Sequence, residues 1–130
     1  MDISPTVFFI AIFAILQVPI TMVVALTRRK AQISLMDGGN DILKQRIRAH
    51  GNFTETVPIT LLAMAAAEYS GASLLLLWIG GGIFLIARIL HYKTVSQHGY
   101  GTGRVWGILT TLAIMLFFAG YALLAQLHIL

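Results

Sequence analysis

Three polar side chains are spaced so that they share one face of a predicted helix. Arg48, Asn52 and Glu55 stand at positions i, i+4 and i+7, which at about 100° per residue places them at roughly 0, 40 and −20° around the helix axis. A guanidinium donates hydrogen bonds, a carboxylate accepts them and an amide does both, so these groups can compensate one another. The stripe predicts either a hydrogen-bonded seam between helices or one wall of a binding site.

Further basic residues follow at positions that can join this stripe. Arg88 and His91 lie three residues apart on one face of a later predicted helix, and Arg104 begins the last one. Taken alone, Arg88 could extend to lipid headgroups, and Arg104 could follow the general preference for basic residues on the cytoplasmic side. At the membrane depth where these side chains are expected to meet, Arg48, Arg88 and Arg104 outnumber the one acid expected there, Glu55. A surplus of guanidinium groups favours an anionic ligand.

The helices that must position these residues are predicted membrane spans. Of the 130 residues, 58% are hydrophobic and 11% are charged, and the mean hydropathy is +0.84. Soluble domains carry about 25% charged residues, so most of this chain must be solvated by lipid. A bilayer core about 30 Å thick needs about 20 apolar helical residues. Four such runs predict a single domain, residues 1–130, with spans at about 3–27, 51–68, 72–92 and 105–126.

The distribution of basic residues predicts how the spans are oriented. Basic residues lie in or beside the loop after the first span and the loop before the last, whereas both termini and the link between spans two and three carry none. By the positive-inside tendency these two loops face the cytoplasm and both termini face away from it. The first span is followed, not preceded, by Arg28, Arg29 and Lys30, which is the reverse of a secretory signal. We therefore expect a multi-pass integral membrane protein.

Composition excludes several classes of site. The chain has no cysteine, which excludes a disulfide framework, a thiolate metal site and a protein cysteine nucleophile. Its histidines show no ligand pairing with a carboxylate at helical spacing, so we expect no metal site. Nine Lys and Arg residues scattered among hydrophobic runs do not form the dense basic face that nucleic acid requires. We expect no nucleic-acid partner.

Small residues and turn-forming residues predict where helices pack closely and where the chain turns. Glycines 80–82 and the alanine-rich stretch 63–67 allow close helix packing, either within the chain or between subunits. Residues 37–41 (DGGND) form a turn cluster in which Asp41 could cap the next helix. Glu68 is interpreted as a marker of the membrane interface, and His50 as pointing away from the Arg48 stripe.

Residues 46–58 (RIRAHGNFTETVP) resemble the signature R-x-H-x-N-x-x-E-x-x-P of the MAPEG family, the membrane-associated proteins in eicosanoid and glutathione metabolism. The resemblance extends over the chain, through the Asp-Gly-Gly turn before the signature, residues 88–91 (RILH) and Arg104. The chain is most similar to short bacterial members and resembles microsomal glutathione transferase. This implies an all-α integral membrane four-helix bundle that forms a homotrimer in a bacterial inner membrane.

The resemblance also implies the residues of the site. Glutathione would bind between neighbouring subunits near the cytoplasmic side, with Arg104 as the catalytic residue at its sulfur. One of Arg28, Arg29 and Lys30 would provide an additional anchor. Thr56 and Val95 depart from the pattern, because some members have tyrosine at both places. The implied glutathione-contacting residues are Arg48, Asn52, Glu55, Arg88 and His91.

The implied activity is that of a membrane-bound glutathione transferase or peroxidase. Glutathione would be the co-substrate, and its thiolate would attack apolar electrophiles or lipid hydroperoxides dissolved in the bilayer. The alternative is a non-catalytic lipid-binding scaffold of the same fold, which would show no saturable glutathione binding. A third alternative, a small multidrug exporter, would carry a carboxylate in its first span, and the first span here has none.

Overall fold

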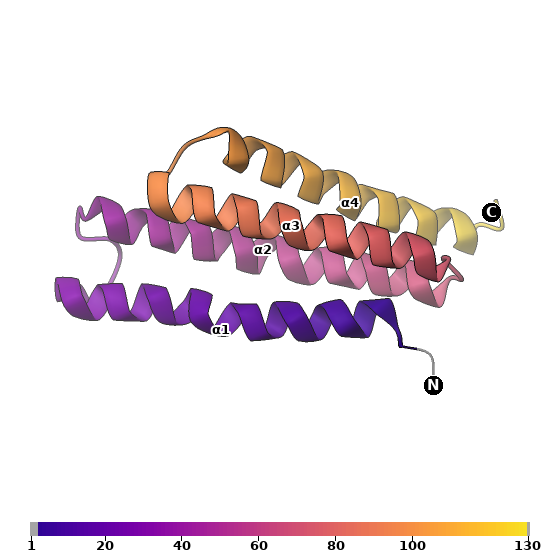
Figure 1. Cartoon of the computed structure of the whole chain (residues 1–130), viewed down its shortest axis with the longest axis horizontal. Coiled ribbons are helices and arrows are strands. Elements are labelled where there is room, and N and C mark those ends of the chain that lie inside the picture. Colours follow the sequence, from indigo (N-terminus) through magenta and orange to yellow (C-terminus); the bar gives the residue numbers. More distant parts are fainter. Residues whose placement is uncertain (1–2, 130) are drawn as a thin grey trace.

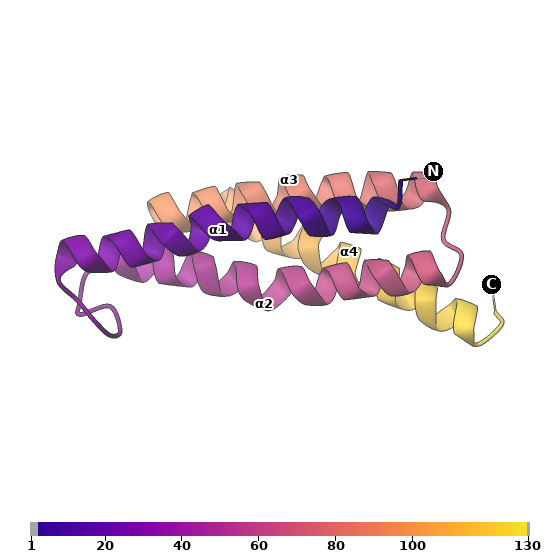
Figure 2. The same ribbon diagram turned by 90° about the horizontal axis from the view of Figure 1, so that it is seen from below.

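The computed structural model describes residues 3–129, which form four helices joined by turns. In Figures 1 and 2 all four run along the long axis of the molecule, and Figure 1 shows the α1–α2 and α3–α4 connections at one end and the α2–α3 connection at the other. The described residues contain no strand, and the predicted all-α four-helix bundle is confirmed. The helices are α1 (Pro5–Ala31), α2 (Asp41–Tyr69), α3 (Leu74–His98) and α4 (Thr102–Gln126).

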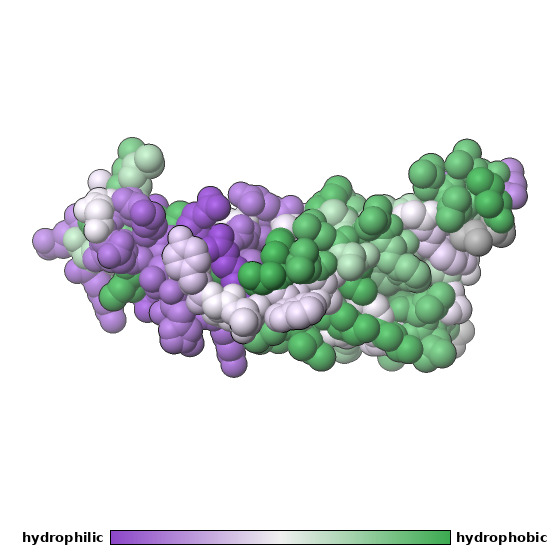
Figure 3. Space-filling model, turned by 90° about the horizontal axis from the view of Figure 1, so that it is seen from above, coloured by the Kyte–Doolittle hydropathy of each residue, from purple (hydrophilic) through white to green (hydrophobic). Residues whose placement is uncertain are grey.

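The hydrophilic surface is concentrated at the end that holds turns 32–40 and 99–101, which we call the basic end. Figure 3 shows hydrophilic residues gathered there and hydrophobic residues over most of the remaining length. Within residues 3–129, the helices α1, α3 and α4 are long and apolar enough to cross a bilayer. The first half of α2 carries charged side chains, and its second half is apolar. The chain is a multi-pass membrane protein whose polar groups collect at one end.

All four helices extend beyond the predicted spans at the basic end. Helix α1 continues to Ala31, α2 begins at Asp41, α3 continues to His98 and α4 begins at Thr102, because a helix need not end where its apolar run ends. The side chain of Asn40 accepts a hydrogen bond of 2.9 Å from the Leu43 N–H and thereby caps α2. Asn40, not Asp41, is therefore the capping residue, and Asp41 lies in the first helical turn.

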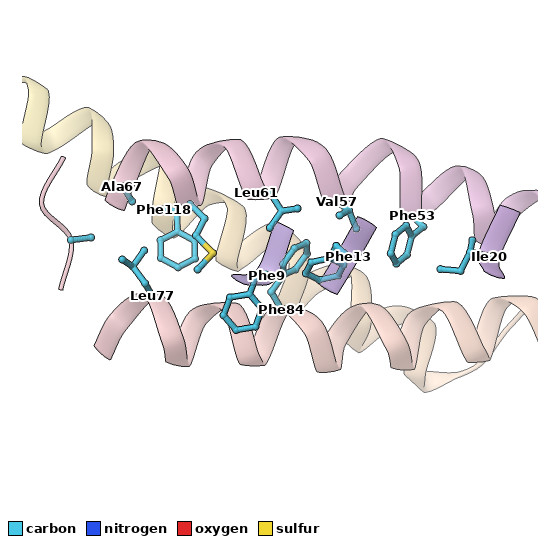
Figure 4. Packing of buried hydrophobic residues seen from close by; sticks show 12 residues of the cluster. Phe9, Phe13, Ile20, Phe53, Val57, Leu61, Ala67, Leu77, Phe84 and Phe118 are labelled. Atoms are coloured by element: carbon cyan, nitrogen blue, oxygen red, sulfur yellow. The ribbon is translucent and has the colours of Figure 1, made fainter. Parts of the chain in front are cut away.

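Aromatic side chains fill the centre of the bundle, as Figure 4 shows. The Phe13 ring lies 4.7 Å from the Phe84 ring and 5.9 Å from the Phe53 ring, centroid to centroid. A Cβ atom added at Gly80 would overlap Phe118, and one added at Gly81 would overlap Phe9. These two glycines therefore serve packing within the chain, whereas a Cβ at Gly82 would meet nothing within 4 Å.

Polar contacts attach α1 to α2 near both ends. At the end opposite the basic end, the Thr6 backbone N–H donates a hydrogen bond of 3.0 Å to the Glu68 carboxylate. Near the basic end, the Arg46 guanidinium donates to the Thr27 hydroxyl. Glu68 is thus more than an interfacial marker, because its negative charge lies at the positive amino end of α1.

A third polar contact joins the two helices between these points. His50 Nε2 lies 3.2 Å from both Gln17 Nε2 and Thr21 Oγ1. His50 therefore faces α1, in agreement with the prediction that it points away from the Arg48 stripe. Polar atoms that would be costly to expose to lipid are paired across the α1–α2 contact instead.

Replacing Glu68 by alanine should destabilise the attachment of α1. The substitution removes the acceptor for the Thr6 N–H, and loss of a helix-capping acceptor typically costs about 1 kcal/mol. Thermal unfolding followed by circular dichroism in detergent would measure the loss, with Tyr69→Phe, an exposed neighbour, as the matched control. Equal stability of the Glu68→Ala variant and the wild type would contradict this role.

Candidate functional site

A pocket at the basic end collects polar side chains from α2, from α4 and from the turn before α4, and we call it the basic pocket. Its volume is about 370 Å³, within the range of about 300–1,000 Å³ that is typical of small-molecule sites. Three cationic side chains, those of Lys44, Arg48 and Arg104, face one carboxylate, that of Asp41. The lining residues are Asp41, Lys44, Gln45, Arg48, Asn52, Val95, Gly99, Tyr100 and Arg104. The excess of positive charge suits an anion.

Arg104 is held at the start of α4 by local contacts. Its Nη1 donates a hydrogen bond of 3.2 Å to the Gly99 carbonyl, and its guanidinium carbon lies 5.3 Å from the centroid of the Tyr100 ring. Gly101, which precedes α4, provides no side-chain cap for the helix, so the positive amino end of α4 lies beside the pocket. This arrangement places a fixed cation and a helix amino end on the same side of the cavity.

His91 positions the first turn of α4 rather than lining the pocket. The side chain is 2% exposed, and its Nδ1–H donates a hydrogen bond of 2.9 Å to the Arg104 carbonyl. Gly107 makes this contact possible, because a Cβ there would lie 2.6 Å from the His91 Cβ and 2.8 Å from the Ala87 carbonyl oxygen. The close approach of α3 and α4 therefore determines where Arg104 stands.

Arg88 lies inside the bundle, away from the basic pocket. It is 0% exposed, its Nη1 donates a hydrogen bond of 3.4 Å to the Thr111 hydroxyl, and its guanidinium carbon lies 5.9 Å from the centroid of the Phe53 ring. It lines a different cavity, between α1 and α3. The structure thus brings Arg48, Asn52 and Arg104 together and leaves Arg88 apart, and the contact of Arg88 with glutathione stays a prediction.

The basic pocket of a single chain is formed without Glu55 and without the basic residues at the end of α1, although glutathione contacts were predicted for both. Glu55 is exposed, and the basic pocket is formed without it. At the end of α1, the Arg28 Nη1 donates a hydrogen bond of 2.6 Å to the Met36 carbonyl, while Arg29 and Lys30 are exposed. Any contact of these residues with a ligand in the basic pocket would require a second copy of the chain.

Several residues of the pocket were missed by the sequence analysis. Lys44 and Gln45 lie four and three residues before Arg48, so helical periodicity would have placed them on the same face had the start of α2 been recognised at Asp41. Tyr100 follows α3 in a turn, where periodicity gives no signal. Val95, noted as a departure from the tyrosine of some MAPEG members, does line the pocket.

Comparison with known proteins identifies relatives of the chain. A family model described as "MAPEG family" matches residues 6–124. Two curated proteins called "Inner membrane protein YecN", from Escherichia coli strains K12 and O6:H1, are each 35% identical to this chain over 65 residues. Each match covers 50% of this chain and 50% of the relative. Their described location agrees with the multi-pass architecture of this chain.

Gly107→Ala should disturb the contact that positions Arg104. The added methyl group must push α3 and α4 apart, because it meets a backbone oxygen and a buried histidine, and such overpacking typically costs about 1–3 kcal/mol. Gly120→Ala is the matched control on the same helix, since a Cβ there meets nothing within 4 Å. Thermal unfolding of both variants measures the difference, and a Gly107→Ala variant as stable as Gly120→Ala would contradict the tight contact.

Proposed function

The chain belongs to the MAPEG family, and on that premise we propose that it is a membrane-bound glutathione transferase with peroxidase activity. One observation carries the proposal: Arg48 and Asn52 of α2 and Arg104 of α4 line a single cavity with an excess of positive charge. These are residues that the resemblance to the family assigns to glutathione. The cavity lies at the basic end, where a water-soluble ligand can enter.

Glutathione matches the charges of the basic pocket. The tripeptide carries two carboxylates, one ammonium and a thiol. Lys44 and Arg48 provide charge-assisted donors for its carboxylates, Asn52 can bind its peptide groups, and Asp41 supplies a carboxylate for its ammonium. Glu55 would take part only when a neighbouring copy covers the outer face of α2.

Arg104 would act on the sulfur. An unperturbed thiol has a pKa of about 8.5, and only the thiolate is a strong nucleophile. A guanidinium keeps its proton at neutral pH, so it would favour the thiolate by ion pairing without acting as a base. The partly apolar surroundings strengthen that interaction. His91, through the Arg104 carbonyl, would hold the guanidinium in place.

The electrophile would reach the sulfur from the bilayer. In conjugation, the thiolate forms a C–S bond to an electrophilic carbon and a leaving group such as chloride departs with its electron pair. In peroxide reduction, the thiolate attacks a hydroperoxide oxygen, the O–O bond breaks, and the alkoxide takes a proton to become an alcohol. The resulting sulfenic acid then condenses with a second glutathione to give a disulfide and water. The site would thus join a soluble nucleophile to a lipid-soluble partner.

We further propose that the working unit is a homotrimer. Glu55 is an exposed carboxylate on a helix of an apolar bundle, which is costly in lipid. A neighbouring copy covering this face of α2 would shield the carboxylate and bring the basic residues at the end of α1 toward the basic pocket. The α2 face is therefore the expected subunit contact.

A second candidate, a non-catalytic lipid-binding scaffold, is favoured by a groove between α1 and α2. The groove has a volume of about 620 Å³ and is lined almost wholly by apolar side chains, among them Phe13, Val57 and Leu61. Such a surface could present a lipid without chemistry. Saturable glutathione binding measured by titration calorimetry in detergent separates the two candidates, because only the transferase requires it.

Arg104→Ala should lose turnover more than affinity. Removing a group that stabilises charge at the reacting atom typically lowers kcat by about 10²- to 10³-fold, whereas Arg48→Ala should mainly raise KM for glutathione. Initial rates with 1-chloro-2,4-dinitrobenzene in nanodiscs test both, and His98→Ala, an exposed residue at the same end, is the control. Wild-type activity in Arg104→Ala would refute the role at the sulfur.

A further inference from the structure

Arg104 has few contacts to hold its side chain in place. It is half-buried at the start of α4, and among residues 3–129 its guanidinium has one hydrogen-bond acceptor, the Gly99 carbonyl, 3.2 Å from Nη1. An arginine side chain has several rotatable bonds and loses conformational freedom when it is fixed. A single hydrogen bond leaves the guanidinium free to turn about it, so a defined position needs a second contact.

Tyr100 provides that second contact. The centroid of its ring lies 5.3 Å from the guanidinium carbon of Arg104, within the roughly 6 Å over which a cation is attracted to the face of an aromatic ring. The Tyr100 side chain is 81% exposed, so packing in the hydrophobic core does not account for its position. Both side chains line the basic pocket, and the contact between them therefore shapes one part of its wall.

The turn that carries Tyr100 is packed closely on both sides of this residue. Gly99 and Gly101 have φ angles of +71° and +145°, which residues with a side chain rarely adopt. A Cβ atom at Gly99 would lie 3.3 Å from Gln45 Nε2 of α2, and one at Gly101 would lie 2.9 Å from Thr94 Cγ2 of α3. The turn thus packs against two helices, and this holds the Tyr100 backbone beside the first turn of α4.

We propose that Tyr100 is the positioning residue of Arg104. The ring holds one face of the planar guanidinium and the Gly99 carbonyl holds Nη1, so the guanidinium stays in the wall of the basic pocket instead of extending into water. A guanidinium has five N–H donors, and those that the Gly99 carbonyl does not take remain for an anion in the pocket. The catalytic consequence rests on the proposed function, whereas the position of the guanidinium is a property of the free protein.

Two other roles for Tyr100 lead to different expectations. A tyrosine that contacts the ligand through its hydroxyl would lose its effect when replaced by phenylalanine, whereas a ring that holds Arg104 would keep it. A tyrosine that only anchors the chain in the membrane interface would be equivalent to other exposed aromatic residues near the start of α4. Trp106, which is 66% exposed and lines a different pocket, is such a residue and serves as the control.

The position of Arg104 can be measured without any ligand. In the full chain with isotope-labelled arginine in detergent micelles, NMR resolves the guanidinium N–H signals, and Arg104→Lys identifies the signal of Arg104. The ring current of Tyr100 should shift that signal upfield. Tyr100→Leu should move it downfield, toward the signal of the exposed Arg29, whereas Tyr100→Phe and Trp106→Leu should leave it in place. An unchanged signal in Tyr100→Leu, or an equal movement in Trp106→Leu, would overturn the proposal.

A substitution in the turn tests the same point without altering the ring. Gly101→Ala should displace Tyr100, because the added methyl group meets Thr94 and the φ angle is unfavourable. It should therefore move the Arg104 signal as Tyr100→Leu does. Gly39→Ala is the matched control, since Gly39 also has a positive φ angle, +77°, and a Cβ there meets nothing within 4 Å. A signal that stays in place in Gly101→Ala, or moves equally in Gly39→Ala, would contradict the proposal. Size-exclusion profiles and thermal unfolding show that each variant is folded.

The consequence for catalysis is measured in nanodiscs with glutathione. The ultraviolet absorbance of the bound thiolate, followed against pH, gives the pKa of the glutathione thiol, which a fixed guanidinium at Arg104 should lower. Tyr100→Leu should raise that pKa and lower kcat by about tenfold or more, since a misplaced group can cost up to about 10²-fold, and KM should change little. Tyr100→Phe should behave as the wild type does, because it keeps the ring.

The two measurements separate failure of this proposal from failure of the transferase. If the wild type binds the thiolate but Tyr100→Leu has the same thiol pKa and the same kcat, Tyr100 does not position Arg104 for catalysis and the proposal is wrong. If no thiolate forms in the wild type, the transferase is wrong, and the NMR signal of Arg104 alone decides the role of Tyr100. Equal loss of activity in Tyr100→Phe and Tyr100→Leu would assign the role to the hydroxyl and refute the ring contact.

Discussion

The close contact of α3 and α4 at Gly107 is the constraint on which the polar interior depends. With no side chain at Gly107, the Cα and Cβ of His91 and the carbonyl of Ala87 lie against the backbone of α4. Two polar pairs then cross the same contact, His91 to the Arg104 carbonyl and Arg88 to the Thr111 hydroxyl. A single glycine thereby sets the position of a cation at the membrane surface and of another in the interior.

The sequence predicted the family and the helical bundle well because both depend on local signals. Lengths of apolar runs predicted four helices, and the spacing of Arg48 and Asn52 correctly placed both on one face of α2 that lines the basic pocket. Helix ends were less accurate, because apolarity marks the part of a helix inside lipid. Capping by a side chain such as that of Asn40 extends the helix into the polar region.

The remainder of the site could not be predicted because it depends on how helices are rotated against one another. Glu55 shares the face of Arg48 by periodicity, yet it lies about two turns farther along α2 and is exposed in a single chain. Arg88 and Arg104 were expected at one depth, but only Arg104 meets the basic pocket. The direction in which Arg88 turns follows from its contacts with Thr111 and Phe53, which are distant in sequence.

The contacts between α1 and α2 bear on how the protein is made. The side chains of Gln17 and Thr21 in α1 contact His50 in α2. The Glu68 carboxylate of α2 accepts a hydrogen bond at the amino end of α1. During synthesis these partners are made after α1, because the chain grows from its amino end. The polar contacts of α1 with His50 and Glu68 can therefore form only once α2 has been synthesised.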